Sequence, residues 1–305
     1  MGKTAYDIET YRSSHAVVIV FGIVGNILVV VSILRQKKVL KNNYYFLVVH
    51  LAICDLGALI IFVFHHVNWY LVEDHLVYST KYCAFICISY FFQAAGPGMM
   101  LIISLLRYRA TVHPLKPAIS RQKLKVVCGL VYLGSLIAGY GVFLPQCFLQ
   151  NDSYFKFRYF RHACTTFFLI VTTIFMAVVY YKIGQALMKQ NKYMKRVCSN
   201  PVRRSAPSSS FKILKFIRNR RTFLVCLITV LCFVTGHIPM SVWYILCIAK
   251  ESHFLMENAW IARLGNVLLV VGVHSVNPLI YGILDKRLLT FWKFCRKKKQ
   301  RPQGN

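Results

Sequence analysis

The stretch 44–67, YYFLVVHLAICDLGALIIFVFHHV, carries one acidic residue, Asp55, in an otherwise almost wholly apolar run. A helix rises about 1.5 Å per residue, so about 20 apolar residues cross the roughly 30 Å of hydrocarbon in a bilayer. This stretch is long enough to do so. It predicts a membrane-spanning helix with a carboxylate at bilayer depth.

Six further apolar stretches of similar length lie along the 305-residue chain, separated by short connections. The seven predicted spans are 16–34, 44–67, 82–106, 126–147, 165–187, 222–248 and 261–283. Because the stretches are continuous rather than alternating, a β-barrel is excluded. We therefore predict an all-α membrane protein, a seven-transmembrane helix bundle over 16–283. An extracellular tail over 1–15 precedes it.

The charge is strongly basic, with 38 Lys and Arg against 9 Asp and Glu. Such a balance indicates nucleic-acid binding or an anionic membrane surface, and a composition that is 57% hydrophobic argues against nucleic acid. Basic residues in short loops mark the cytoplasmic side of a membrane protein. With the N-terminus outside, 30 of the 38 basic residues fall on the inner face. The sequence therefore predicts an outer N-terminus and an inner C-terminus.

The segment 284–305 combines large apolar residues with many Lys and Arg, which predicts an amphipathic eighth helix and a polybasic cytoplasmic tail. Cys295 directly precedes the run 296–299, RKKK. A cysteine beside a polybasic segment is the arrangement expected for palmitoylation, since stable anchoring requires two signals. A free cysteine is the alternative. With or without the lipid, the apolar residues and the polybasic run would bring the tail to the membrane lipids.

Asp55 is the one acidic residue within a predicted span. A carboxylate at bilayer depth costs at least about 2.5–3.5 kcal/mol, so it normally faces the bundle interior and has a function. Asn26 in the first span and Asn277 in the seventh are the expected polar partners. We predict that the three side chains form a buried cluster, with a locally satisfied structural aspartate as the alternative.

Short motifs stand in order on six of the predicted spans. They are Gly25-Asn26, the run 51–56 LAICDL, the run 104–108 SLLRY, Tyr180 with Ile183, Phe233 with Pro239, and the run 277–281 NPLIY. Together these motifs resemble those of the rhodopsin-like (class A) G-protein-coupled receptors. The chain is identified as a divergent member of that family, and the likeness covers the whole transmembrane region.

The resemblance implies a multi-pass plasma-membrane receptor that binds an extracellular ligand and activates a heterotrimeric G protein by outward movement of its sixth helix. It implies no cofactor except an allosteric sodium ion held by Asp55, Asn26 and Asn277. The residues it assigns to the G-protein coupling switch are Arg107, Tyr108, Tyr180 and Tyr281. Those it assigns to the pivot of the sixth helix are Phe233, His237 and Pro239.

Several positions depart from the family pattern. Leu106 replaces the acidic residue that normally precedes the arginine, and the inner end of the sixth span offers no carboxylate either. We expect no ionic lock and elevated basal signalling, unless packing of Leu106 replaces the lock. His237 stands where a tryptophan is usual and His50 where an asparagine is usual, and the fourth span lacks its usual tryptophan.

The outer face carries three further expectations. Cys83 opens the third span, where the family's disulfide to the second outer loop begins. Its partner is Cys164 or Cys147, and Cys164 is favoured because it ends a polar loop. Asn151 begins an Asn-Asp-Ser glycosylation sequon, which places that loop outside. Alternating aromatic and basic residues over 154–161 predict a short β-hairpin.

Two ligand classes are excluded by missing side chains. The third span has no Asp or Glu to pair with an amine, and the seventh has no Lys to form a Schiff base with retinal. A peptide or a small organic molecule remains. The candidate contacts in the outer half of the bundle are Ser89, Gln93, Trp243 and Tyr244.

Three other functions are alternatives to a signalling receptor. The altered residues on the third and sixth spans would also suit a non-signalling or decoy receptor. A channel or transporter is less favoured because no inverted repeat is visible. An enzyme is not expected, since the chain has no HExxH or comparable metal-ligand spacing.

Overall fold

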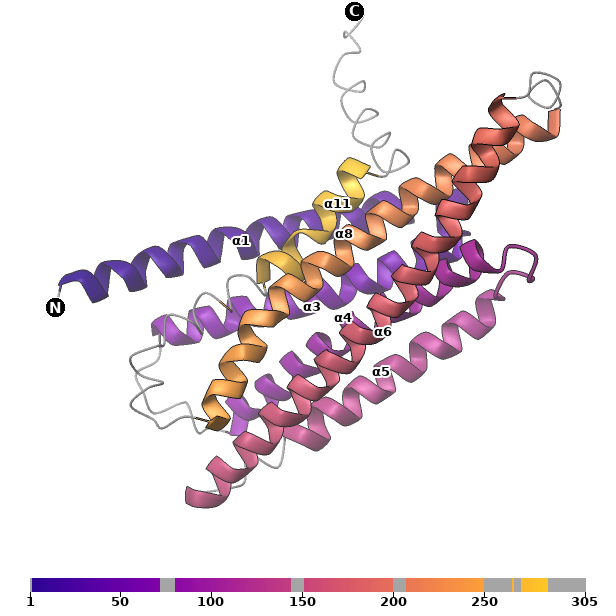
Figure 1. Ribbon diagram of the computed structural model, residues 1–305. Helices are drawn as coiled ribbons and strands as arrows, with labels where there is room; N and C mark the ends of the chain where they lie inside the picture. Colours follow the sequence, from indigo (N-terminus) through magenta and orange to yellow (C-terminus); the bar gives the residue numbers. More distant parts are fainter. Residues whose placement is uncertain are drawn as a thin grey trace, which may run out of the picture.

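The computed structural model describes residues 2–71, 80–143, 151–199, 207–249, 265 and 270–284. These ranges form long α-helices that run beside one another as a bundle (Figure 1). The elements are α1 (Gly2–Leu34), α2 (Lys37–Leu40), α3 (Asn43–Leu71), α4 (Thr80–Val112), α5 (Arg121–Phe143), α6 (Asn151–Ser199), α8 (Pro207–Ala249), the π-helix η3 (Val270–Ser275) and α11 (Asn277–Leu284).

Six of these helices contain an apolar window long enough to cross a membrane. They are α1, α3, α4, α5, α6 and α8, and they match the first six predicted spans in order. The seventh predicted span coincides with η3 and α11 in the part that the structure describes. The prediction of an all-α membrane bundle is confirmed. The predicted eighth helix, the polybasic tail and Cys295 lie outside the described residues.

The predicted β-hairpin over 154–161 is wrong, because α6 is helical from Asn151 onward. Once a helix has formed, each added residue gains a hydrogen bond without a new nucleation cost. The apolar span that follows 154–161 supplies that nucleus, so the segment continues the helix. In the same way α1 extends back to Gly2, ahead of the predicted first span.

The interior of the bundle is built around α3 and α4. The α3 helix packs against α1 and α4, α4 packs against α5 and α6, and α6 packs against α8. Leu47, Leu51 and Leu59 on α3 are fully buried, as are Met99 on α4 and Phe233 on α8. Asp55 on the α3 helix is 1% exposed and therefore faces neighbouring helices rather than lipid.

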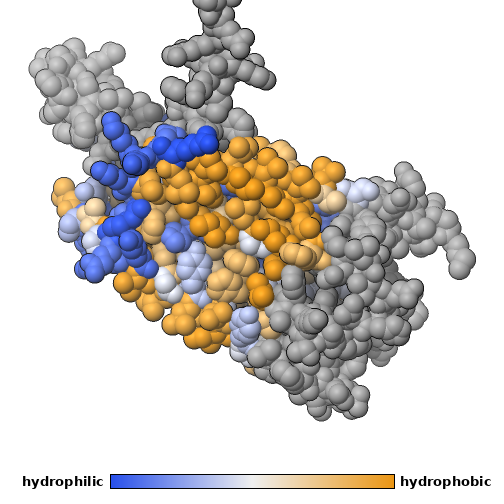
Figure 2. All heavy atoms as spheres, turned by 180° about the vertical axis from the view of Figure 1, so that it is seen from behind, coloured by the Kyte–Doolittle hydropathy of each residue, from blue (hydrophilic) through white to orange (hydrophobic). Residues whose placement is uncertain are grey.

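The outer surface is apolar, as a membrane environment requires. Figure 2 shows one broad hydrophobic face, with hydrophilic residues gathered at one side. On α5, Val126, Leu130, Leu133 and Ile137 are all more than half exposed. Their spacing of three and four residues puts them on one helix face, which marks α5 as a lipid-facing helix.

Glycines let α1 approach the seventh-helix segment closely. A Cβ on Gly22 would collide with Ser275 Oγ and would lie 2.8 Å from Leu59 Cδ1. A Cβ on Gly25 would lie 2.8 Å from the Cβ of Pro278. Small residues at such contacts let helix backbones pack tightly in membranes. This contact brings the next residue, Asn26, against η3.

One departure from the family pattern, His50, faces Tyr132 across α3 and α5. His50 Nδ1 and Tyr132 Oη are 2.9 Å apart, and the Cys54 thiol lies 3.9 Å from the same hydroxyl. One turn away, the Arg121 guanidinium stacks 3.8 Å from the centroid of the Phe46 ring. The histidine and the tyrosine thus form one polar contact within the membrane span.

Candidate functional site

Asp55 on α3 is 1% exposed and accepts a hydrogen bond at each carboxylate oxygen. His274 Nδ1 lies 2.8 Å from Oδ1, and Asn277 Nδ2 donates to Oδ2 at 2.8 Å. Both partners come from the seventh-helix segment, His274 from η3 and Asn277 from α11. The predicted contact between Asp55 and Asn277 is present, and it ties α3 to that segment.

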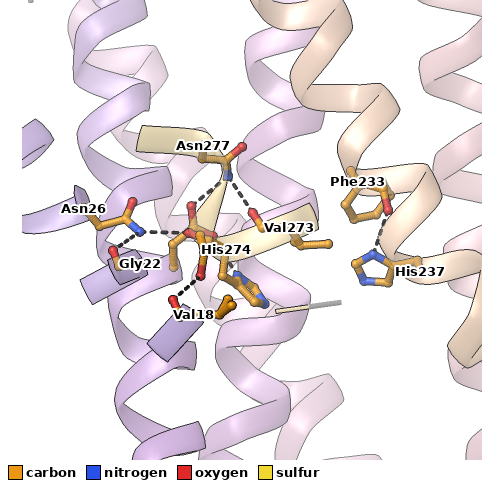
Figure 3. A network of polar contacts seen from close by, with 10 residues as sticks. Val18, Gly22, Asn26, Phe233, His237, Val273, His274 and Asn277 are labelled. Carbon is orange, nitrogen blue, oxygen red and sulfur yellow. Dashed lines mark hydrogen bonds and ion pairs between the residues drawn. The ribbon is translucent and has the colours of Figure 1, made fainter. Parts of the chain in front are cut away.

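Asn26 on α1 joins the same network through the backbone. Its side-chain Nδ2 donates to the carbonyl of Gly22 and to the carbonyl of His274, each at 2.9 Å (Figure 3). Asn26 is 1% exposed, so both contacts are shielded from water. The predicted cluster therefore exists, but Asn26 reaches it through the main chain of His274 rather than through Asp55.

The π-helix η3 explains why the backbone carbonyls of His274 and Val273 are available to side-chain donors. A π-helical turn shifts the backbone hydrogen bonds of an α-helix by one residue and leaves carbonyls for other donors. The His274 carbonyl accepts from Asn26, and the Val273 carbonyl accepts from Asn277 Nδ2 at 2.7 Å. Ser275 Oγ in turn donates to the Val18 carbonyl at 3.1 Å. The turn is thereby fixed against α1.

His274 was not among the predicted site residues, although a sequence signal existed. It is an ionisable residue within a membrane span, which is by default a candidate for function. It also lies three residues before Asn277, about one helical turn away on a similar face. Its direct contact with Asp55 is made from η3, a π-helical turn that no sequence motif predicts.

The three residues of the predicted pivot lie together on α8. Phe233 is fully buried, and His237 Nδ1 donates to its carbonyl at 3.0 Å (Figure 3). The two rings lie 4.2 Å apart, centroid to centroid. Pro239 stands inside the helix two residues further on. Since proline lacks an N–H and clashes with the preceding turn, it weakens the helix at this point.

A second cluster joins four helices toward the end of the bundle where α6 and α8 project together (Figure 1). The Arg107 guanidinium on α4 lies over the Tyr44 ring of α3. Ser104 Oγ donates to the Met100 carbonyl and lies 3.5 Å from the hydroxyl of Tyr180 on α6. Cys226 on α8 lies against Arg107, Tyr44 and Tyr180.

Of the predicted switch residues, Arg107 and Tyr180 both lie in this cluster, whereas the Tyr108 side chain lies outside it. The Tyr108 ring packs edge-on against His113 at 5.6 Å and contacts the cluster of Val179, Ile183 and Leu187. Tyr281 is part of α11, and its side chain lies outside the described residues. Tyr44 and Cys226 were missed because neither belongs to a motif that carries the family resemblance.

The predicted ligand contacts occupy two helices at the end of the bundle where α4 begins and α8 ends. On α4, Gln93 Nε2 donates to Ser89 Oγ at 2.9 Å. On α8, Trp243 and Tyr244 are half-buried, and Tyr244 packs against the main hydrophobic core. A role for these four side chains in ligand binding remains a prediction.

The favoured disulfide is not present. Cys164 is a half-buried free thiol. Cys164 belongs to α6 rather than to the polar loop on which the expectation was based. The side chain of Cys83 and the alternative partner Cys147 lie outside the described residues, as does the side chain of Asn151. Glycosylation at Asn151 stays a prediction.

A family profile described as 7 transmembrane receptor (rhodopsin family) matches residues 25–281. The chain belongs to this family. Its members are receptors rather than enzymes. The match spans every motif on which the resemblance was based, from Gly25 to Tyr281.

The relatives in this family are distant. The human neuromedin-K receptor is 22% identical over 316 residues, which cover 95% of this chain and 62% of that receptor. The substance-P receptor of Cavia porcellus is 23% identical over 309 residues, covering 93% of this chain and 70% of that receptor. The chain therefore spans less than two thirds of the neuromedin-K receptor.

The crystal structure of squid rhodopsin shares the fold. The two structures superpose with a TM-score of 0.76 over 96% of this chain and 87% of that one, at 14% sequence identity. So low an identity supports the helix arrangement alone. The side-chain networks described above are properties of this chain.

Proposed function

We propose that this protein is a plasma-membrane receptor that binds an extracellular peptide and activates a heterotrimeric G protein. The observation that supports it most is the family match over 25–281, with receptors for neuromedin-K and substance P among the relatives. The absence of Asp and Glu from α4 also argues against an amine ligand. A small organic ligand is the other possibility.

The charge distribution supports the orientation that this function needs. Lys and Arg gather in the segments beside the end where α6 finishes and α8 starts, and that end would face the cytoplasm. Arg107, Tyr180 and Cys226 meet toward the same end from α4, α6 and α8. A swing of α8 about Pro239 would separate Cys226 from Arg107 and open this face to a G protein.

The test is nucleotide exchange by a panel of purified G proteins with the full chain in nanodiscs. Peptides including neuromedin-K and substance P are added in turn. We expect one peptide class to accelerate exchange, and Arg107→Ala to reduce the accelerated rate at least tenfold, about 1.4 kcal/mol. Lys125→Ala, an exposed basic residue on α5, is the matched control and should leave the rate unchanged.

A non-signalling receptor is the second candidate, favoured by Leu106 in place of the family's acidic residue. This candidate predicts saturable ligand binding with no exchange on any G protein. An accelerated exchange rate that is the same in Arg107→Ala as in the wild-type protein would contradict the coupling role of Arg107. Ligand binding without exchange across the panel would select the second candidate.

A further inference from the structure

The expected sodium site at Asp55 can be tested against the atoms that surround this carboxylate. Hard cations such as sodium are bound by several oxygen ligands. Here both carboxylate oxygens face nitrogen atoms, His274 Nδ1 and Asn277 Nδ2, each at 2.8 Å. Asn26, the third predicted ligand, uses its Nδ2 group on two carbonyl oxygens. The residues therefore do not fit a sodium ion.

One oxygen near the network remains without a hydrogen-bond partner, the buried Oδ1 of Asn277. The orientation of this amide is fixed, because its Nδ2 serves both Asp55 Oδ2 and the Val273 carbonyl. Turning the amide over would set its oxygen against two other acceptors. A single amide oxygen directed away from the carboxylate does not complete a coordination shell.

We propose that the imidazole of His274 takes the place of the cation as the partner of Asp55, and that this closes the internal site to sodium. The junction between α3 and the seventh helix is then made by the chain itself. Its formation does not depend on the salt that surrounds the receptor.

The backbone holds His274 in this position from two sides. Its carbonyl accepts from Asn26, and the neighbouring Ser275 Oγ donates to the Val18 carbonyl, so η3 is anchored to α1 at two successive residues. The Phe62 ring of α3 lies 6.2 Å from the imidazole, centroid to centroid. With 1% exposure, His274 has no route to water short of moving the helix.

If the imidazole closes the site to sodium, removing it should open the site. A buried carboxylate that loses its partner strongly destabilises the folded protein. A cation that fits beside the carboxylate would therefore be bound in place of the lost partner. Substituting His274 by serine would leave a space beside Asp55 Oδ1 and would add a hydroxyl oxygen. The carboxylate would then face an opening in which a small cation and its water molecules can be held.

The experiment measures the melting temperature of the purified full chain as sodium chloride replaces choline chloride at constant ionic strength. We expect no sodium-dependent shift for the wild-type protein. We expect His274→Ser to melt lower in choline and to regain stability as sodium rises. The double variant His274→Ser/Asp55→Asn should lose that dependence, because the carboxylate is gone.

Two further variants serve as controls. His50→Ser removes a histidine from another membrane contact and should destabilise the protein equally in both salts. His274→Gln retains an N–H donor of similar reach, so its melting temperature should not depend on sodium. If His274→Ser does not fold, the wild-type and Asp55→Asn measurements still test the proposal.

Two results would overturn the proposal. One is a wild-type melting temperature that rises with sodium and ceases to do so in Asp55→Asn. The other is a folded His274→Ser protein that remains indifferent to sodium. Neither measurement uses a ligand or a G protein, so a failure of the proposed signalling function would not alter the result.

Discussion

The guanidinium carbon of Arg107 lies 3.8 Å from the centroid of the Tyr44 ring, joining α4 to α3. A cation over an aromatic face is worth about 0.5–2 kcal/mol, with the larger values where water is excluded. Tyr44 is 5% exposed, so this contact is shielded. Because Leu106 removes the usual acidic neighbour, the ring is a restraint on Arg107 that needs no carboxylate.

Replacing Tyr44 by leucine should therefore free Arg107 and raise basal nucleotide exchange. We expect an increase of about twofold to thirtyfold, the range that corresponds to the free energy of the contact. Exchange without ligand on the responsive G protein measures it. Tyr44→Phe keeps the ring and should stay near the wild-type rate. Equal rates for Tyr44→Leu and wild type would show that the ring does not restrain Arg107.

A carboxylate placed beside Arg107 should have the opposite effect. Leu106→Asp should lower basal exchange, because an ion pair with Arg107 would stabilise the resting arrangement. Leu106 also packs against the main core, so the substitution loses apolar contact as well. Leu106→Asn has the same shape without the charge and separates the two effects. If both variants lower exchange equally, the expected role of the missing ionic lock is refuted.

The contact between His50 and Tyr132 should be measurable as a coupling energy. Tyr132→Phe and His50→Ala each remove one side of the 2.9 Å hydrogen bond. We expect each to lower the free energy of unfolding by about 1–3 kcal/mol, because the remaining partner is left in an apolar setting. The double variant should lower the free energy of unfolding by less than the sum of the two single variants. Strict additivity in reversible unfolding would show that the two groups do not interact.

The helix arrangement could be predicted from the sequence because each span is long, continuous and apolar. Asp55 and Asn277 could be paired because each is polar where a membrane span permits few polar groups. His274 stands out in the sequence as an ionisable residue within a span, one helical turn before Asn277, but the π-helical turn from which it contacts Asp55 could not be predicted. Such a turn changes which side chains share a face, and no motif for η3 stands in the sequence.

The contact between His50 on α3 and Tyr132 on α5 illustrates the same limit. His50 is visible in the sequence as a departure from the family pattern, but Tyr132 lies 82 residues further along the chain, and no motif singles it out. Only the packed helices show that Tyr132 supplies the partner for His50. The prediction of a β-hairpin over 154–161 was wrong for a different reason. A two-residue alternation is a weak signal beside a strong apolar helix that can extend over it.

The contact between α1 and η3 should be sensitive to a single methyl group. Gly22→Ala would place a Cβ into Ser275 Oγ and 2.8 Å from Leu59 Cδ1, so α1 must move away. Overpacking of this kind costs about 1–3 kcal/mol. The movement would also draw Asn26 from the His274 carbonyl, which adds the loss of a buried hydrogen bond. We expect a clearly lower melting temperature.

Gly129→Ala is the matched control, because no heavy atom lies within 4 Å of a Cβ at this position on α5. Alanine is the better helix former by about 1 kcal/mol, so the melting temperature should stay equal or rise slightly. Adding Ser275→Ala to Gly22→Ala removes the nearest obstacle and should recover part of the stability. If Gly22→Ala and Gly129→Ala melted alike, close approach of α1 would not be what positions Asn26 against η3.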